Sequence, residues 1–281
     1  MQAIQLLDVA ELSYPSASAI EFHKDRLYVI GDDAPYLLVL SKEYQLIDSV
    51  FFWPEVNGRI PKKEKHDIES AMIIQQKGKP VLYGVGSASS EKRRNWLMYD
   101  LQNGTIRDTS LLNSDFQFPT VNALNIEGSS AYQDVFLLAN RANLSNPENH
   151  LIIVEGPQQF DVKRIMLPKT KSLAGISGLA YSHENDLLLL TLSEEETTST
   201  TSDGKIGESY LAYIRKFSTK LKQRHMTPDV ILQLSHSSPA FKLQKIESVC
   251  IEAETRQEMT LHLVADNDDG KSKLFKIRLT L

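Results

Sequence analysis

A unit of short strands recurs five times along the 281 residues, and this repeat limits the possible folds more than any other feature. Each unit begins with a strand that carries a polar residue near its start, and these residues are Ser18, Glu69, Asn122, Ser177 and Glu247. A second strand that ends in a polar cluster follows, and then come a third and a fourth apolar strand. A period of roughly 50 residues with four strands is typical of one blade of a β-propeller.

The two ends of the chain predict how the ring of blades closes. The fifth unit ends after its third strand, whereas the N-terminal strand at residues 4–12 has no unit of its own. We expect this strand to be the outer strand of the last blade, because an open blade would expose an edge that promotes aggregation. The sequence therefore predicts an all-β fold, a single β-propeller domain over residues 1–281 with five four-stranded blades.

The fourth unit leaves one alternative open. The step from Ser177 to Glu247 is the longest, and it contains the polar stretch 194–209, which predicts an enlarged loop. If residues 194–220 supplied additional strands instead, the propeller would have six blades.

Composition excludes several classes of protein. The net charge of −5, from 31 basic and 36 acidic residues, argues against a nucleic-acid-binding surface, which usually needs a basic face. Cys250 is the only cysteine, so a disulfide framework is excluded, and its apolar surroundings predict a buried thiol. No apolar run approaches the roughly 18 residues of a membrane span. We expect a monomer, cytoplasmic as the sequence stands, or periplasmic or secreted if a signal peptide has been removed.

The polar positions of the repeat are expected to converge on one face. In a propeller the first strand of each blade lines the central channel, and the loop after the second strand opens beside it. The polar residues of those loops are Asp32, Asp33, Ser87, Ser89, Asn140, Arg141, Glu195, Glu196, Asp266 and Asp268. The channel mouth is therefore the predicted functional site.

An oxygen-rich group in the channel predicts a cation site. Calcium takes six to eight oxygen ligands, and carboxylates that face one another need a cation or a shared proton. The candidate metal ligands are Glu69, Asn122, Glu247 and Asp266. The alternative is that these groups hydrogen-bond to channel water and to neighbouring backbone.

A local basic group predicts an anion site beside the cation. Arginine and lysine near hydroxyl groups hold phosphate or carboxylate oxygens. We expect Ser87, Arg94, Asn140 and Arg141 to bind an anionic small molecule, with Glu195 and Asp266 on the opposite, acidic side. Lys62, Lys63, Lys92 and Arg93 are expected to be solvated. The alternative is that both candidate arginines pair with Glu195 or Asp67 and tie the blades together.

Several segments resemble a family of uncharacterised bacterial β-propellers, which is distantly similar to the esterase-like phytase and other calcium-dependent propellers. The matching segments are KHDIESAMII, GVGSASSEKRRNWLMYDL, LANRANL, KIESVCIE and VADNDDGKSKLFKIRL, together with the stretch that begins SGLAYS. The resemblance implies a propeller, with site residues at Asp67, Glu69, Ser87, Arg94, Arg141, Glu195, Glu196 and Thr197. The chain departs from the family pattern at Val85–Gly86 and at Ala142.

Two functions remain open. In the first, the channel binds an anionic small molecule, with or without a divalent cation such as Ca²⁺, or serves as a protein-interaction scaffold. In the second, the protein is a calcium-dependent hydrolase of phosphate or other anionic esters, with Asp67, Glu69 and Glu195 as catalytic residues. There the cation would activate water, and Arg94 and Arg141 would stabilise developing negative charge. A propeller can host either function, so the fold does not decide between them.

Overall fold

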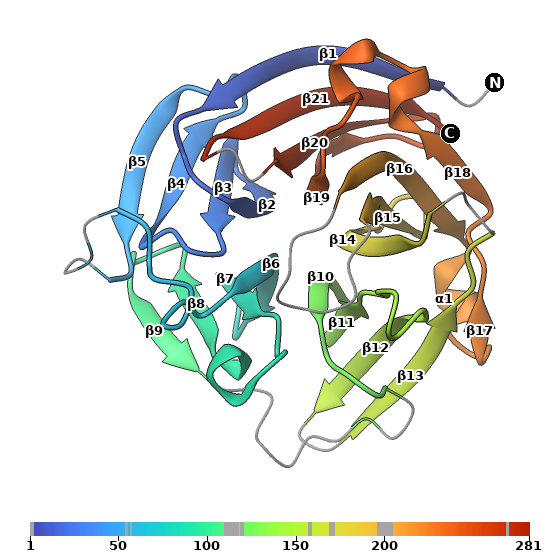
Figure 1. The fold of residues 1–281 in the computed structure, drawn as a ribbon, viewed down its shortest axis with the longest axis horizontal. Helices are drawn as coiled ribbons and strands as arrows, with labels where there is room; N and C mark the ends of the chain where they lie inside the picture. Colours follow the sequence, from blue (N-terminus) through green and yellow to red (C-terminus); the bar gives the residue numbers. More distant parts are fainter. Residues whose placement is uncertain are drawn as a thin grey trace.

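The computed structural model is a five-bladed β-propeller (Figure 1). It describes residues 3–53, 56, 58–109, 118, 121–156, 159–168, 172–195, 205–267 and 270–281. The sheets surround a central channel, and the innermost strand of each blade is the first of its repeat. The predicted all-β propeller with five blades is thus confirmed.

The first two blades follow the predicted order of four antiparallel strands. Blade 1 consists of β2 (Ala17–His23), β3 (Arg26–Gly31), β4 (Tyr36–Ser41) and β5 (Leu46–Phe51). Blade 2 consists of β6 (Ile68–Gln76), β7 (Lys79–Gly86), β8 (Trp96–Asp100) and β9 (Ile106–Thr109), with the 3₁₀ helix η1 (Glu91–Arg94) between β7 and β8.

The third and fourth blades are linked by an additional strand. Blade 3 consists of β10 (Ile126–Tyr132), β11 (Val135–Asn140), β12 (Asn149–Gly156) and β13 (Gln159–Ile165). Blade 4 consists of β14 (Ala174–Ser182), β15 (Leu187–Glu195), β16 (Ile206–Arg215) and β18 (Val230–Gln233). Between β16 and β18 the chain forms α1 (Phe217–Lys220) and β17 (His225–Met226), and β17 pairs in parallel with β13.

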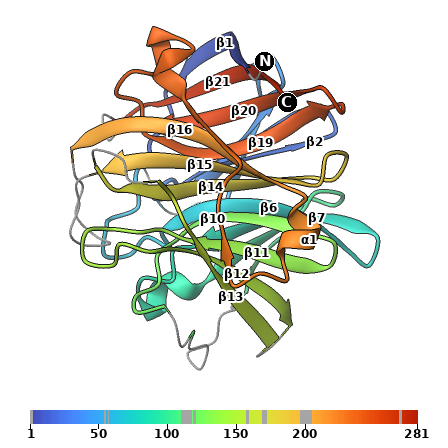
Figure 2. The same cartoon turned by 90° about the vertical axis from the view of Figure 1, so that its right-hand side faces the viewer.

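The fifth blade joins the two ends of the chain, as predicted. It consists of β19 (Ile246–Glu254), β20 (Glu258–Asp266), β21 (Ser272–Thr280) and β1 (Ala3–Leu12), preceded by the 3₁₀ helices η2 (Leu234–His236) and η3 (Pro239–Phe241). Strand β1 pairs antiparallel with β21, and the two run side by side in both views (Figures 1 and 2). The register from Ala3 opposite Thr280 to Leu12 opposite Ser272 covers the outer edge of β21.

The apolar side chains of the strands fill the spaces between neighbouring blades. Five hydrophobic clusters are present among the described residues, and each takes its members from two adjacent blades around the ring. A strand in the middle of a blade therefore buries both of its faces. Strand β15, with the sequence LLLLTLSEE, is buried along its whole length. Cys250 is one of these core residues, which confirms the predicted buried thiol. In the described part of the chain, no helix has the length and apolar character that a membrane crossing needs.

The predicted alignment of the third unit was wrong. The apolar residues near Asn122 were assigned to the innermost strand, but Asn122 is exposed and β10 begins only at Ile126. The channel-facing residue of this blade is Glu127. The segment before β10 mixes apolar and polar residues over a short stretch, as a strand does. Its length and pattern therefore do not distinguish it from the strand that follows.

The long fourth step also differs from the prediction of one enlarged loop. Strands β15 and β16 extend into the stretch 194–209, so that Glu194 and Glu195 belong to β15. Much of the added length lies instead after β16, in the excursion through α1 and β17. Residues 196–204 lie outside the described residues.

Candidate functional site in the central channel

A β-bulge places one side chain of every innermost strand toward the channel. In each blade the pairing of the first strand with the second skips one residue near the start of the first strand. The skipped residues are Ser18, Glu69, Glu127, Ser177 and Glu247. A bulge leaves its extra residue outside the ladder and re-aims the side chain, so these five residues share one position of the repeat.

The two serines at this position hold neighbouring blades together. The Ser18 hydroxyl donates to the carbonyl of Ile68 at 2.5 Å, and the Ser177 hydroxyl donates to the carbonyl of Ile246 at 2.6 Å. Each acceptor is the residue immediately before the bulge of another blade. Both serines are buried, so their hydroxyls are used structurally. The three glutamates remain as the channel-facing groups.

Two of these glutamates surround a buried arginine. Nη2 of Arg141 lies 3.1 Å from Oε2 of Glu195, while Nη1 lies 3.6 Å from Glu127 and 3.7 Å from Glu247. Nζ of Lys245 lies 2.9 Å from Glu247 and 3.5 Å from Glu195. We call these five residues the Arg141 cluster. Its charges are interleaved, with three carboxylates around two cations.

A glycine makes room for the arginine of this cluster. A Cβ atom on Gly175 would lie 2.5 Å from Cγ and 2.7 Å from Nε of Arg141. A Cβ atom does not approach non-bonded heavy atoms this closely, so any other residue at position 175 would displace the Arg141 side chain. The glycine belongs to β14, and it therefore positions a charged group of the neighbouring blade.

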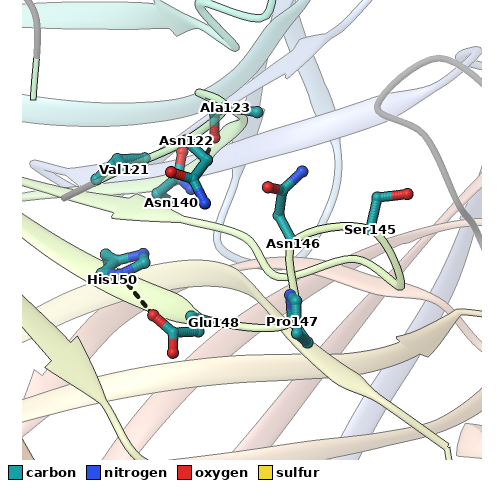
Figure 3. A pocket seen from close by; sticks show the side chains of 9 residues that line it. All are labelled: Val121, Asn122, Ala123, Asn140, Ser145, Asn146, Pro147, Glu148 and His150. Atoms are coloured by element: carbon teal, nitrogen blue, oxygen red, sulfur yellow. Dashed lines mark hydrogen bonds and ion pairs between the residues drawn. The ribbon is translucent and has the colours of Figure 1, made fainter. Parts of the chain in front are cut away.

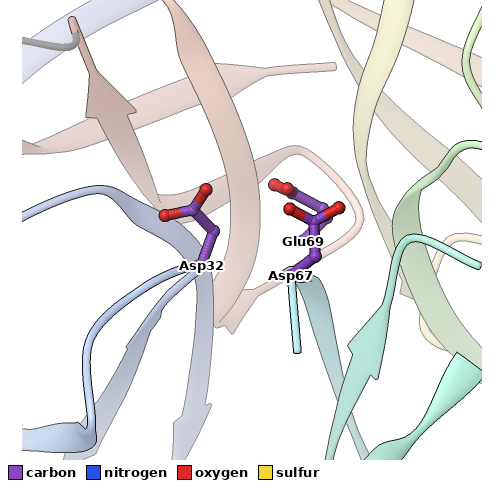
Figure 4. Close-up of side chains that lie close together, drawn as sticks. All are labelled: Asp32, Asp67 and Glu69. Carbon is purple, nitrogen blue, oxygen red and sulfur yellow. The ribbon is translucent and has the colours of Figure 1, made fainter. Parts of the chain in front are cut away.

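A second group of charges, the Asp67 cluster, comprises Asp32, Asp67, Glu69, Lys65 and Arg93. Oxygen atoms of its three carboxylates lie within 4.8 Å of one another, and Figure 4 shows the carboxylates facing each other across two blades. Nζ of Lys65 contacts Asp32 and lies 2.8 Å from Oδ1 of Asp67. Nη1 of Arg93 lies 2.9 Å from Oδ2 of Asp67.

Asp67 is held in place by backbone conformation and by a serine. Its φ of 56° lies in the left-handed region, which is unusual for a residue other than glycine. The Ser87 hydroxyl donates to Oδ2 of Asp67 at 2.5 Å, and the Ser87 amide donates to the Asp67 carbonyl at 2.9 Å. The strained backbone and these two bonds fix the carboxylate beside Lys65, and such strain concentrates at functional sites.

Burial and mutual repulsion raise the pKa values of several site carboxyls. Burial, followed by the charges of Asp67, Glu127 and Asp32, raises the pKa of Glu69 well above its usual value. Burial raises the pKa of Glu127 to about 7, although Arg141 opposes this shift, and it raises the pKa of Asp32 to about 6 against the effect of Lys65. For Lys245 and Arg141 burial lowers the pKa, but the surrounding glutamates outweigh it and the net shift is upward.

Some oxygen atoms of the Asp67 cluster have no partner of their own. Within the described residues, the Glu69 carboxyl makes neither a hydrogen bond nor an ion pair. Oδ1 of Asp32 is buried and has no hydrogen-bond partner among the residues that the structure describes. These free oxygens, together with the short separations in the cluster, suit a hard cation such as Ca²⁺. The competing feature is the Lys65 ammonium, which already contacts two of the three carboxylates.

The structure brings most of the predicted site residues to one end of the channel. Asp67, Glu69 and Ser87 meet in the Asp67 cluster, and Arg141, Glu195 and Glu247 meet in the Arg141 cluster. Asp266 is buried nearby, and its amide donates to the carbonyl of Lys245. Glu196, Thr197 and Asp268 lie outside the described residues.

Other predicted residues take different positions. The basic residue that contacts Asp67 is Arg93, which had been expected to be solvated, and not its neighbour Arg94. The Asn140 side chain accepts from the amide of Asn125 at 2.7 Å and donates to the carbonyl of Ala123 at 3.2 Å, so it braces the chain before β10. Asn122 does not reach either cluster.

The expected separation of basic and acidic sides was also wrong. Arg141, which follows β11 of blade 3, contacts Glu195 of blade 4 directly, as in the alternative in which arginines tie blades together. Arg93 contacts Asp67 directly within blade 2. Unpaired charges of one sign on each side would be expensive in a buried site, and interleaving removes that cost.

Sequence reasoning missed Glu127, Lys65 and Lys245 as site residues, and it placed Asp32 at the channel mouth without assigning it a role. A short pattern could have identified Glu127, because an apolar residue, a polar residue and a small residue recur at every bulge. The five instances are Ala17–Ala19, Ile68–Ser70, Ile126–Gly128, Ile176–Gly178 and Ile246–Ser248. Aligning the units on this triplet would have placed Glu127 at the channel.

Comparisons with known proteins agree with this fold. The sequence profile of DUF6929, a family of unknown function, matches residues 13–279. No curated protein matches the chain. The structure is similar to that of glutaminyl cyclase from Myxococcus xanthus, with 9% identity, 99% of this chain and 97% of that chain covered, and a TM-score of 0.56. It is also similar to the arabinanase Arb43A of Bacillus subtilis, with 13% identity, 95% of each chain covered and a TM-score of 0.52. At these identities the likeness shows the fold alone.

Proposed function

The chain belongs to the DUF6929 family, and we propose that its propeller binds a divalent cation at the Asp67 cluster and, together with that cation, an anionic small molecule at the same channel mouth. The observation that carries this proposal is the state of Glu69. Its carboxyl lies within 4.8 Å of two other carboxylates and has no hydrogen bond or ion pair in the described part of the chain. A group in this situation either keeps a proton or binds a cation.

The donor set fits a hard cation. Asp32, Asp67 and Glu69 come from blades 1 and 2 and supply carboxylate oxygens, which Ca²⁺ and Mg²⁺ prefer. Three side chains do not complete the six to eight oxygens that Ca²⁺ takes. The remaining ligands would be water and the oxygens of the bound anion. Because the protein supplies only part of the coordination shell, we expect the cation and the anion to bind together.

Charge balance gives the coupling its direction. With Glu69 protonated, the carboxylates of Asp32 and Asp67 balance the cations Lys65 and Arg93. A divalent cation that displaces the Glu69 proton adds two positive charges and uncovers one negative charge, so the cluster becomes net positive. Without the cation the cluster is neutral, and with the cation bound its positive charge would attract an anion.

Lys65 has two roles in this proposal. In the cation-free protein its ammonium contacts both Asp32 and Asp67 from inside the cluster, and together with Arg93 it balances their charge. When a divalent cation takes those carboxylates, the flexible side chain is released and can pair with the incoming anion. A lysine suits this exchange because it is a point charge on a mobile stem.

Hydrolysis of the bound anion is a second candidate, and the state of Glu127 favours it. Burial raises the pKa of this carboxyl to about 7, which suits a general acid or base at neutral pH. Glu127 lies at the same position of the repeat as Glu69, on the next blade. The bound cation would polarise the ester oxygen, and Glu127 would take a proton from the attacking water. As the ester bond breaks, the same carboxyl would return that proton to the departing alcohol.

Thermal melts and calorimetric titration with CaCl₂ and with MgCl₂ at pH 8 test the cation site. We expect the melting temperature of the wild type to rise with cation concentration, by the equivalent of about 2.7 kcal/mol at about 100 times the dissociation constant. Glu69→Gln should abolish the rise and retain its own stability, because a neutral amide resembles the protonated carboxyl. Glu258→Gln, an exposed glutamate on blade 5, is the matched control.

Two outcomes decide the proposal. A wild type without heat of binding or thermal shift for either cation would refute the cation site. Methyl phosphate that binds equally well with and without Ca²⁺ would refute the coupling. Cleavage of p-nitrophenyl phosphate or p-nitrophenyl acetate, lost with a chelator and in Glu127→Gln, would support the hydrolase candidate, and its absence would leave binding as the function.

A further inference from the structure

A hollow of about 250 Å³ lies on blade 3, between the segment before β10 and the connection from β11 to β12 (Figure 3). We propose that it binds a neutral, polyhydroxylated molecule of monosaccharide size, at a site separate from the two charged clusters of the channel. Six of its lining residues carry hydrogen-bonding side chains, and they are Asn122, Asn140, Ser145, Asn146, Glu148 and His150. Asn140 directly precedes Arg141, so the hollow adjoins the channel mouth.

His150 presents an acceptor that lacks a donor. Its Nε2 lies 3.5 Å from Oε2 of Glu148, as the dashed line in Figure 3 shows. Burial lowers the pKa of His150, so the imidazole is neutral, and the adjacent carboxylate favours the proton on Nε2. Nδ1 then carries a lone pair.

That lone pair accepts no hydrogen bond from the described residues. Nδ1 is buried and has no hydrogen-bond partner in the described part of the chain, and His150 as a whole is only 7% exposed. An unsatisfied buried acceptor is costly, and such groups in a folded protein call for a functional explanation. A ligand hydroxyl that donates to Nδ1 would remove the cost.

Two asparagine side chains on the rim are also available. In Figure 3, Asn122 and Asn146 lie on different sides of the hollow, and neither side chain makes a hydrogen bond to the described residues. Each amide offers two donor hydrogens and an acceptor oxygen. By contrast, the Asn140 side chain is used to brace the backbone. The free groups of the hollow thus require a ligand that both donates and accepts.

The charges of the hollow favour a neutral ligand. No lysine or arginine belongs to the described lining, so an anion would face Glu148 without a cation to receive it. Glu148 itself is paired with Arg164 at 2.9 Å, so it does not demand a cationic ligand. Closely spaced hydroxyls satisfy both requirements, and Val121 and Pro147 offer apolar surface to the C–H faces of a sugar ring.

The size of the hollow agrees with this class of ligand. Pockets for drug-sized molecules span about 300–1,000 Å³, so a hollow of about 250 Å³ suits a single sugar ring and excludes a long oligosaccharide from full enclosure. Its open side is formed by the exposed residues Asn122, Ser145 and Pro147, through which a ligand could enter.

Ligand-detected NMR and calorimetric titration with a panel of methyl glycosides of glucose, galactose, mannose and xylose test the site. Inorganic phosphate and putrescine serve as anionic and cationic comparators. We expect one or more glycosides to bind the wild type and neither comparator to bind at this hollow. Asn122→Ala and Asn146→Ala should each weaken binding by about fivefold or more, the scale of one neutral hydrogen bond. Gln257→Ala, an exposed amide on blade 5, should change nothing.

The ¹⁵N resonance of His150 Nδ1 gives a second readout, because it should move upfield when a glycoside hydroxyl donates to it. Failure of every glycoside to bind up to its solubility limit would overturn the proposal. So would binding that survives both asparagine substitutions, or a hollow that takes phosphate or putrescine instead. Glycoside binding should persist in Glu69→Gln and without divalent cations, so its outcome is independent of the channel proposal.

Discussion

The ammonium of Lys65 lies 2.8 Å from Oδ1 of Asp67 and also contacts Asp32, so a lysine from the connection before β6 occupies the carboxylate cluster that faces the channel. The positive charge of Lys65 reduces the repulsion between these two carboxylates. It also makes the lysine a tethered competitor of any free cation. The balance between Lys65 and a divalent cation is therefore the property to perturb first.

Replacing Lys65 by methionine should strengthen divalent-cation binding. Removing one positive charge leaves Asp32 without its ion-pair partner and leaves Asp67 paired with Arg93 alone. Two unit charges 4 Å apart interact by about 4 kcal/mol at an effective dielectric constant of 20. We expect affinity for Ca²⁺ to rise by at least about tenfold, which corresponds to about 1.4 kcal/mol. Isothermal titration at pH 8 measures the change. Lys62→Met, an exposed lysine in the same connection, should leave the affinity unchanged, and an unchanged affinity in both variants would contradict the competition.

Replacing Arg141 by methionine should destabilise the whole propeller. The substitution leaves Glu127, Glu195 and Glu247 around an apolar side chain, and Lys245 remains as their ion-pair partner among the described residues. Removing one partner of a buried ion pair typically costs about 3–5 kcal/mol. Urea unfolding at pH 7 should show this loss, whereas Arg256→Met, which alters an arginine whose side chain is 87% exposed, should stay within about 0.5 kcal/mol of the wild type.

The stability of the protein should fall between about pH 4.5 and pH 7, in part because of Glu127. Its pKa is raised to about 7 in the folded protein from a usual value of 4.5, so the folded state binds a proton that the unfolded state has released. The contribution is complete below the unfolded pKa and is lost as the pH rises through the folded pKa, with a slope of up to about 1.4 kcal/mol per pH unit.

Glu127→Gln tests this linkage, because the amide cannot titrate. Urea unfolding at pH 5, 6 and 7 should give a shallower decline in the variant than in the wild type. Glu69 and Asp32, whose pKa values are also raised, should maintain the remaining slope. Parallel pH profiles for the two proteins would show that Glu127 does not hold its proton in the folded state.

Ser18→Ala should weaken the junction between blades 1 and 2 without changing the cation site. The substitution removes the donor to the carbonyl of Ile68 and leaves that acceptor buried, at a cost of about 1–3 kcal/mol. Ser177→Ala should behave alike at the junction with Ile246. Urea unfolding measures the loss, and calcium titration should give the wild-type affinity. Reduced affinity in Ser18→Ala would mean that the serine also serves the site.

The five-bladed ring could be predicted because the features that specify it are local sequence patterns and the number of repeats. Strand-length apolar runs, their turns and their period of about 50 residues specify the blades, and the unpaired N-terminal strand specifies the closure with β21. The same repeat located Glu69 and Glu247 at the channel, because a residue at a fixed position of each unit occupies a fixed place in the ring. It failed at Glu127, because the apolar residues near Asn122 have the pattern of a strand and were aligned in place of β10.

The partners of the charged side chains were decided only by the tertiary structure. Arg141 and Glu195 lie 54 residues apart, and the distance between them depends on how blades 3 and 4 pack and on the space that Gly175 leaves. Arg93 and not Arg94 meets Asp67 because the short helix η1 turns neighbouring residues in different directions. The sequence by itself placed Glu69, Arg141 and Glu247 at the channel mouth, because the repeat fixes their positions in the ring. Blade packing decides which carboxylate each cation contacts, and it leaves Glu69 without a partner among the described residues. Ion pairs depend on distances of a few ångströms, and the sequence repeat does not specify distances this finely.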